Sequence, residues 1–158
     1  MRALAGGLAA AILACSVGTV RAQHAFNLPP AVDLQADAAN AKAKGVPILL
    51  FFDRDDCPYC ERALREFLVP MSKDPQWGAQ AIYRQVEIDR PKLLVDFNGA
   101  KTTHADYARG FSIRLTPTIV MVGPHGETLG DPLVGLLTVD FYSAYLEDTI
   151  TRAREKLE

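Results

Sequence analysis

An apolar run adjoins a Cys-x-x-Cys motif in Val46-Pro47-Ile48-Leu49-Leu50-Phe51-Phe52-Asp53-Arg54-Asp55-Asp56-Cys57-Pro58-Tyr59-Cys60. The apolar part, with its β-branched and aromatic residues, predicts a strand that is buried on both faces. The motif then opens a helix, which places the sulfur of Cys57 at the helix N-terminus and the sulfur of Cys60 one turn further in. The exposed N–H groups and the dipole of a helix N-terminus stabilise a thiolate. These features predict a site of thiol-disulfide exchange.

The helix that follows the motif is clearly amphipathic. Pro58 suits its first turn, because the missing N–H has no partner there, and Pro70 is expected to end it. The pattern predicts that Cys60 faces the interior and Cys57 faces outward. The apolar residues on one face are Cys60, Ala63, Leu64, Phe67 and Leu68, and the charged residues on the other are Glu61, Arg62, Arg65 and Glu66.

The rest of the chain alternates helix, strand and turn signals. Charges that suit the dipole and a glycine just beyond predict a helix over residues 33–44. Asn98-Gly99 predicts a loop or small hairpin inserted at residues 90–102. The remaining elements expected are a strand over Ile82–Asp89, a short helix from Thr103 to Arg109 closed by Gly110, a strand over Thr118–Val122, a turn at Gly123–Gly126, a strand near Thr128–Val134 and a helix from Thr138.

Size and charge narrow the class of protein. The chain has 158 residues, of which 49% are hydrophobic, and this is enough for one domain with its own core. The net charge is −2, with no run of Lys or Arg. A basic patch is the electrostatic footprint of nucleic-acid binding, so nucleic acid is excluded as a partner.

The N-terminus predicts export. Arg2 precedes a stretch without charge over residues 3–20, and Val20-Arg21-Ala22 resembles a cleavage site. We therefore expect a signal peptide at 1–22, a flexible tail at 23–32 and one domain at 33–158. Two alternatives stay open: an uncleaved membrane anchor, and a bacterial lipoprotein that carries a lipid on Cys15.

Cleavage would leave Cys57 and Cys60 as the two cysteines of the exported chain. An oxidising compartment permits a disulfide between them, but a loop this short stabilises a fold little through chain entropy. Reactivity is therefore the favoured explanation of the pair. An inert structural disulfide and half of a zinc site are the alternatives. Zinc sites usually need four ligands, and the other candidates, His24, His104 and His125, are scattered.

The order of these elements resembles the thioredoxin fold, an α/β fold in which helices flank a central mixed sheet. The segment Phe111–Thr118 is similar to the one that leads into the thioredoxin cis-proline, and Val134-Gly135 with the residues to Leu146 is similar to its final strand, glycine and helix. The resemblance covers most of residues 33–150, with an N-terminal helix extension and a small insertion. Within the superfamily, the chain is most similar to exported thioredoxin-like proteins of SoxW type.

The resemblance implies a role for each site residue. Cys57 attacks a substrate disulfide, and Cys60 then releases the mixed disulfide. Pro117 is expected in the cis form, with Thr116 offering its backbone to the substrate. Pro58 and Tyr59 are candidate substrate contacts, although Tyr59 fits equally an ordinary exposed aromatic residue.

The same resemblance implies the cofactors, the location and the partners of the reaction. No cofactor and no metal are expected. The expected location is the periplasm, and the expected partners are cysteine-containing exported proteins. Reduction of their disulfides is favoured over disulfide formation, and it implies a membrane protein that supplies thiol electrons. The rival hypothesis is a client-binding module without turnover, used in cytochrome or sulfur-enzyme assembly, that holds its client beside Thr116-Pro117.

The chain also departs from thioredoxin. Phe51 stands where thioredoxins carry a buried acid, and Asp56 replaces the tryptophan before the first cysteine. The charges of Asp53, Asp55 and Asp56 are expected to oppose a thiolate at Cys57, while Arg54 favours one. The Pro-Tyr dipeptide also occurs in glutaredoxins, but no convincing match to their glutathione-binding residues is present.

Overall fold

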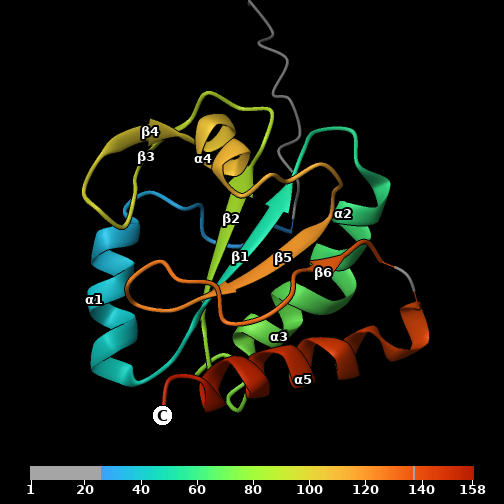
Figure 1. The fold of residues 1–158 in the computed structure, drawn as a ribbon. Coiled ribbons are helices and arrows are strands. Elements are labelled where there is room, and N and C mark those ends of the chain that lie inside the picture. Colours follow the sequence, from blue (N-terminus) through green and yellow to red (C-terminus); the bar gives the residue numbers. More distant parts are fainter. Residues whose placement is uncertain (1–25, 137) are drawn as a thin grey trace, which may run out of the picture.

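The structure is a computed structural model that describes residues 26–136 and 138–158. The predicted signal peptide 1–22, with Cys15 inside it, lies outside the described residues. Figure 1 shows the arrangement of the elements. Within the described ranges, no helix is long and apolar enough to cross a membrane.

A four-stranded mixed sheet has the order β2-β1-β5-β6. The apolar run forms β1 (Ile48–Asp53), and all six of its residues are buried, as predicted. It pairs in parallel with β2 (Ile82–Glu87) and antiparallel with β5 (Thr118–Val122). The edge strand β6 (Leu133–Val134) pairs antiparallel with β5. The predicted thioredoxin-like sheet is therefore confirmed.

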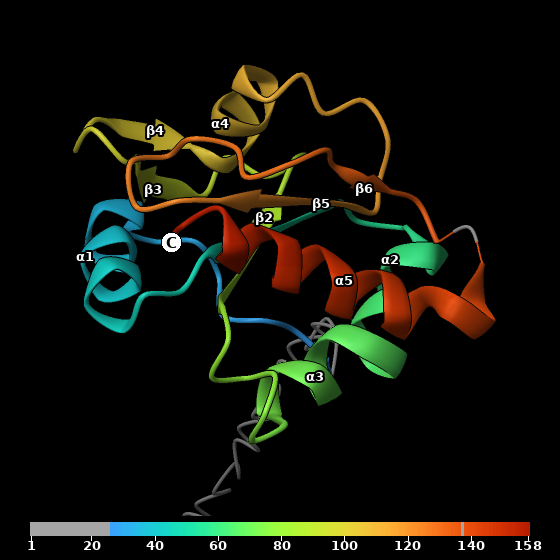
Figure 2. The ribbon, with the colours of Figure 1, turned by 60° about the horizontal axis from the view of Figure 1, so that its bottom comes forward.

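Helices cover both faces of this sheet. Along β1, Leu49 and Phe51 contact the core cluster of α2 (Pro58–Ala63), α3 (Val69–Lys73) and α5 (Tyr142–Glu155). Ile48, Leu50 and Phe52 contact the cluster of α1 (Leu34–Lys44) and α4 (His104–Gly110). This alternation is the period of two expected of a strand. Figure 2 shows α4 on one side of the sheet and α3 and α5 on the other.

Pro70 does not end the dithiol helix, which corrects the prediction. A π-helical segment (Leu64–Leu68) follows α2, and the N–H of Val69 donates to the carbonyl of Leu64, five residues back. Pro70 then falls in the first turn of α3, where its missing N–H is tolerated. The helical run therefore continues to Lys73.

Residues 28–31, which belong to the predicted flexible tail at 23–32, lie against the sheet. The N–H of Ala31 donates to the carbonyl of Gln85 at 2.9 Å, and Leu28 and Ala31 are buried. The free edge of β2 offers backbone partners to a segment that Pro29-Pro30 keeps extended. The helix predicted over 33–44 is confirmed: the side chain of Asp33 caps α1, and Gly45, at φ +63°, ends it.

The predicted insertion is a hairpin of β3 (Leu93–Val95) and β4 (Lys101–Thr103), with Gly99 at φ +81° in its turn. The side chain of Thr103 caps α4, the short helix predicted from this residue. Gly110 is the last residue of α4 rather than its left-handed terminator, because Ser112 takes the positive φ of +55°. His104 joins this region to the domain: its Nδ1 accepts from the N–H of Glu87 at 3.0 Å, and its Nε2 lies 2.7 Å from the carbonyl of Ala31.

The strand predicted near Thr128–Val134 is shorter than expected. Thr128 forms an isolated bridge with Val122, and regular pairing returns in β6. Gly130 (φ +148°) and Pro132, which lacks an N–H, interrupt the ladder between them. The final helix, predicted from Thr138, begins with a 3-10 turn (Val139–Phe141) and continues as α5, in which Tyr142, Leu146 and Ile150 are buried.

The turn after β5 gives a test of how the insertion packs. Gly126 has φ +80°, and a Cβ there would lie 2.9 Å from the ring of Phe97 in the hairpin turn. We expect Gly126→Ala to lower the free energy of unfolding by about 1 to 3 kcal/mol, through the left-handed backbone and the contact. Gly110→Ala, where nothing lies within 4 Å, is the control and should not destabilise. Urea denaturation measures both, and equal stability of the two variants would contradict this packing.

Candidate active site

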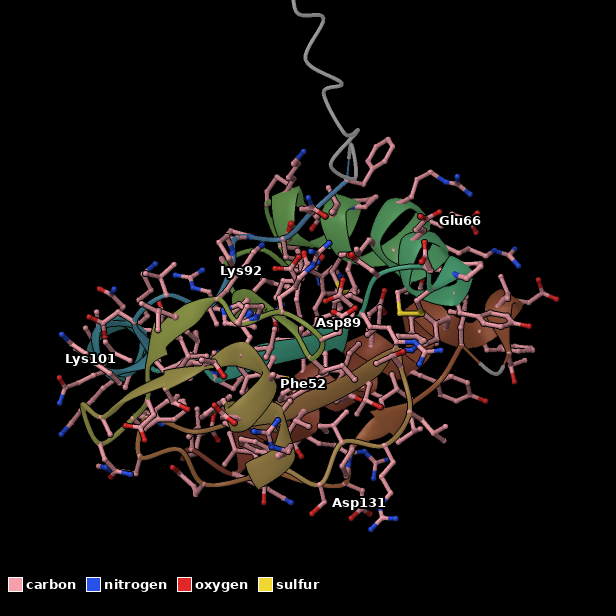
Figure 3. The ribbon with its side chains drawn as sticks, turned by 90° about the horizontal axis from the view of Figure 1, so that it is seen from above. Phe52, Glu66, Asp89, Lys92, Lys101 and Asp131 are labelled. Carbon is pink, nitrogen blue, oxygen red and sulfur yellow. A yellow bond between two sulfur atoms is a disulfide. The ribbon has the colours of Figure 1, made fainter. Side chains whose placement is uncertain are left out.

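The two cysteines meet where β1 passes into α2. Cys57 is the N-cap of α2, and Cys60 lies in its first turn. Their sulfurs form a disulfide of 2.09 Å, with the two Cα atoms 5.2 Å apart. Figure 3 shows this disulfide in yellow at the start of α2. The three-residue spacing therefore lets the sulfurs bond without any unfolding.

The sulfur of Cys57 lies against two hydrogen-bond donors. The N–H of Cys60 is 3.2 Å from Cys57 Sγ. The hydroxyl oxygen of Thr116, which is 59 residues away in sequence, lies 3.6 Å from the same atom. Donors aimed at a sulfur favour its charged form, since hydrogen bonds to charged groups are stronger than neutral ones. The arrangement supports Cys57 rather than Cys60 as the nucleophile.

Cys60 is buried as predicted, but Cys57, which was predicted to face outward, is buried as well. Cys57 is 6% exposed and Cys60 is 2% exposed, so the expected contrast between outward and inward cysteines is small in the disulfide form. Both cysteines belong to the core cluster that packs on this face of the sheet, and Thr116 of the opposite loop contacts Cys57 Sγ. The two residues between the cysteines are exposed: Pro58 occupies the first turn of α2, and Tyr59 is 64% exposed.

The loop before β5 forms the other wall of the site. The Thr116-Pro117 peptide bond is cis, as the resemblance implied. The N–H of Gly135 donates to the carbonyl of Pro117 at 2.7 Å, and the hydroxyl of Thr118 donates to the carbonyl of Leu115 at 2.8 Å. These bonds hold Thr116 against Cys57. The structure thus brings Thr116 and Pro117 together with the dithiol.

The carboxylates before the dithiol have three different environments. Asp55 forms an ion pair with Arg90, and its N–H donates to Asp89 Oδ2 at 3.0 Å. Asp56 is exposed, with φ +53°. Asp53 is only 4% exposed. The three carboxylates therefore do not face Cys57 as equal, exposed charges, and their effect on its thiolate stays a prediction.

Asp53 is the functional candidate that sequence reasoning missed. It shares with Leu49 and Phe51 the sheet face on which the dithiol cluster packs. Gln85 Nε2 donates to its Oδ2 at 2.6 Å, while its buried Oδ1 has no hydrogen-bond partner among the residues that the structure describes. Burial raises the pKa of Asp53 to about 7.

This carboxyl can therefore hold or release a proton at neutral pH. The signal for it was present in the sequence, because a strand buried on both faces that ends in an aspartate predicts a buried acid.

Metal binding has no support in the described part of the chain. Residues 26–136 and 138–158 contain no group of three or more His, Cys, Asp or Glu side chains that could hold a metal ion. His104, one of the scattered candidates, is buried and engaged by backbone groups.

Comparisons with known proteins agree with this geometry. Residues 34–150 match the family model described as a thioredoxin-like domain. Comparison with curated proteins finds no significant match. Among solved structures, a thioredoxin from Fasciola hepatica is similar with a TM-score of 0.55 and 16% identity, over 80% of this chain and 99% of that one. A thioredoxin from Thermus thermophilus is similar with a TM-score of 0.53 and 22% identity, over 80% and 91%. These likenesses show the fold.

Asp53 should make stability depend on pH. Its proton is held to about pH 7 in the folded protein but is released near the ordinary value of 3.8 in the unfolded chain. The folded state therefore binds more protons between these values, so the stability contributed by this group is complete below about pH 4 and falls as pH rises through 7. The two pKa values differ by about three, which corresponds to a loss of roughly 4 kcal/mol in the free energy of unfolding.

We expect Asp53→Asn to remove this loss, measured as the free energy of unfolding of the disulfide form in urea between pH 4 and pH 8. Asp56→Asn, an exposed change in the same loop, is the control and should keep the wild-type dependence. A wild-type slope in Asp53→Asn would show that the carboxyl is not buried as described.

The contact between Thr116 and Cys57 should control reactivity. In a Cys60→Ala background, Thr116→Val removes the hydroxyl but keeps the shape. We expect iodoacetamide to alkylate Cys57 roughly five-fold more slowly at pH 7, the effect of losing about 1 kcal/mol of hydrogen bonding to the thiolate. Thr102→Val, on β4, is the matched control. Equal rates for both variants, with the modified cysteine located by peptide mass, would exclude a role for the hydroxyl.

Proposed function

Because this chain belongs to the thioredoxin-like domain family, we propose that it is a thiol-disulfide oxidoreductase that reduces disulfides in exported proteins. The observation that carries the proposal is the environment of Cys57: an N-cap sulfur, bonded to Cys60, with the N–H of Cys60 and the hydroxyl of Thr116 directed at it. A structural disulfide has no need of such donors.

The reaction follows from these positions. In the reduced protein, the Cys57 thiolate attacks one sulfur of a client disulfide, and the other client sulfur leaves and takes up a proton. The Cys60 thiol then loses its proton and attacks Cys57 Sγ. The Cys57–Cys60 disulfide forms, and the second client sulfur leaves as a thiol. Two electrons thus pass from the dithiol to the client. One of the two protons that the client sulfurs take up comes from the Cys60 thiol and the other from solvent, which received it when Cys57 ionised, and the product is the form that the structure describes.

The client approaches over the cis-proline loop. Thr116 is half-buried beside the attacking sulfur, so its backbone can pair with an extended client segment, while the exposed Pro58 and Tyr59 contact it from the other side. A carboxyl of pKa about 7 on the same sheet face, Asp53, can exchange a proton during the two steps.

The location of the protein, the direction of electron flow and the regeneration of the dithiol are inferred from the sequence. The signal-like residues 1–22 favour the periplasm, where a reductant requires electrons from a membrane thiol donor. The hairpin β3–β4 at residues 93–103 supports a place among the SoxW-type proteins. A client-binding module without turnover is the second candidate. It is favoured by the exposed apolar side chains of Tyr59 and Leu115 beside the loop.

Insulin reduction with dithiothreitol separates the two candidates. We expect the wild type to accelerate precipitation of the insulin B chain and Cys57→Ser to abolish the acceleration, because the nucleophilic sulfur is lost. Thr102→Val serves as a folded control that keeps the activity. Equal rates for wild type and Cys57→Ser would rule out the enzyme and leave the binding module.

A trapping experiment identifies the client proteins. Cys60→Ala cannot complete the second step, so it should accumulate mixed disulfides on Cys57 in the native host. The double variant Cys57→Ser, Cys60→Ala should not accumulate them.

A further inference from the structure

An extended segment, residues 28–31, covers the outer edge of β2 and bonds to one residue of that strand, Gln85. The backbone N–H of Gln85 donates to the carbonyl of Pro29, and its carbonyl accepts from the N–H of Ala31, both at 2.9 Å. The side chain of Leu28 is 3% exposed and packs in the core cluster that contains the dithiol. The segment is therefore attached both to the sheet and to the core.

The side chain of Gln85 links this segment to a buried acid. Its Oε1 accepts from the N–H of Leu28 at 3.1 Å, and its Nε2 donates to Asp53 Oδ2 at 2.6 Å. An amide has an acceptor at one end and donors at the other. Turned around, it would place its oxygen against the carboxyl and its NH₂ against the N–H of Leu28. The amide therefore has one favourable orientation, and the carboxyl lies two hydrogen bonds from Leu28.

Asp53 is poorly satisfied in this closed arrangement. Its side chain is 4% exposed, and its buried Oδ1 has no hydrogen-bond partner within the described part of the chain. A neutral carboxyl tolerates such a site better than a carboxylate, because an unpaired buried charge costs far more than an unpaired buried polar group. Burial accordingly raises the pKa of Asp53 to about 7. Ionisation of Asp53 therefore creates a cost that access of water would remove.

The charged groups around Asp53 do not reverse this effect. Glu87 and Asp89, at the end of β2 and just beyond it, raise its pKa further, while Lys92, which forms an ion pair with Glu87, lowers it by less. The segment 28–31 carries no charge. The remaining titratable groups of the surrounding core cannot change charge near pH 7: the cysteines of α2 form a disulfide, and burial raises the pKa of the phenols of Tyr83 and Tyr142.

His104 holds the other end of the segment and responds to pH with the opposite sign. Its Nδ1 accepts from the N–H of Glu87, so its Nε2 carries the hydrogen and donates to the carbonyl of Ala31 at 2.7 Å. Burial lowers the pKa of His104. Protonation of Nδ1 would break the bond to Glu87 on acidification, so His104 cannot release the segment as the pH rises. Opening at higher pH therefore begins at Leu28.

We propose that residues 28–30 form a strap that is closed over a neutral Asp53 and opens from the Leu28 end when Asp53 ionises. The proton passes to solvent, the Gln85 amide becomes exposed, and water reaches the carboxylate. The two prolines of the strap keep it stiff, because each fixes its own φ. Since Leu28 packs in the cluster of the dithiol, the open state also loosens the core beneath the cysteines. This inference goes beyond the proposed function and needs no client.

The sign of the effect follows from linkage. Asp53 keeps its proton to about pH 7 while the strap is closed, and its pKa moves toward the ordinary value of 3.8 when water surrounds it. The closed state therefore binds more protons, so the strap is tightest below about pH 4 and loosens as the pH rises through 7. The opening constant increases about ten-fold for each unit of difference between the two pKa values.

Amide hydrogen exchange of the full chain in its disulfide form, followed by NMR, measures the opening. The N–H groups of Leu28 and Gln85 lose their strap bonds on opening. Their protection factors, which are corrected for the intrinsic effect of pH, should fall at least about ten-fold from pH 5 to pH 8. Asp53→Asn keeps an acceptor for Gln85 but does not titrate, so its factors should stay constant. Asp56→Asn, an exposed change in the same loop, is the matched control and should keep the fall.

A second variant tests the link should Asp53→Asn not fold. Gln85→Met removes both side-chain bonds and keeps a side chain of similar length. The N–H of Leu28 should then exchange rapidly at pH 5 as well as at pH 8. A fall in protection like that of the wild type would show that the strap does not sense Asp53 through Gln85.

The amide of Leu50, in the central strand β1, is the reference for global unfolding. Strap amides that exchange no faster than Leu50 would overturn the inference, because the strap would then open only with the whole domain. Equal protection of the wild type at pH 5 and pH 8, or an equal fall in Asp53→Asn, would also overturn it. The insulin assay decides the proposed function separately, so the two can fail independently.

Discussion

Burial of β1 on both faces is the constraint on which the rest of this structure depends. All six of its residues are buried, so the strand must lie at the centre of the sheet between two helical layers. At the C-terminal end of β1 the chain leaves the core and begins α2 against the same sheet. The dithiol occurs at that exit, which sets Cys57 at a helix N-terminus and Cys60 against the core.

The site needs a second segment that the dithiol does not contain. Thr116 reaches Cys57 Sγ because β5 lies antiparallel to β1, which returns the chain to the same edge of the sheet. Gly135 of the chain after β5 then holds the carbonyl of Pro117. Reactivity at one sulfur is therefore a property of three segments.

Electrostatics near the dithiol depend on burial more than on formal charge. Three aspartates precede Cys57, yet one is paired with Arg90, one faces solvent, and one is enclosed so that its pKa rises to about 7. Desolvation of Asp53 outweighs the hydrogen bond from Gln85. A count of acidic residues alone gives the wrong picture of the field at the sulfur.

Local pattern was sufficient for β1, the amphipathic dithiol helix, the helix over 33–44, the helix start at Thr103 and the Asn98-Gly99 hairpin, because each depends on residues close in sequence. Family resemblance supplied the cis form of Pro117. Tertiary structure decided the rest: a π-helical turn lets the helix pass Pro70, the β2 edge fixes Leu28 and Ala31, and packing leaves the buried Oδ1 of Asp53 without a hydrogen-bond partner among the described residues. Burial and contact between distant segments are properties of the packed chain, and short-range periodicity does not contain them.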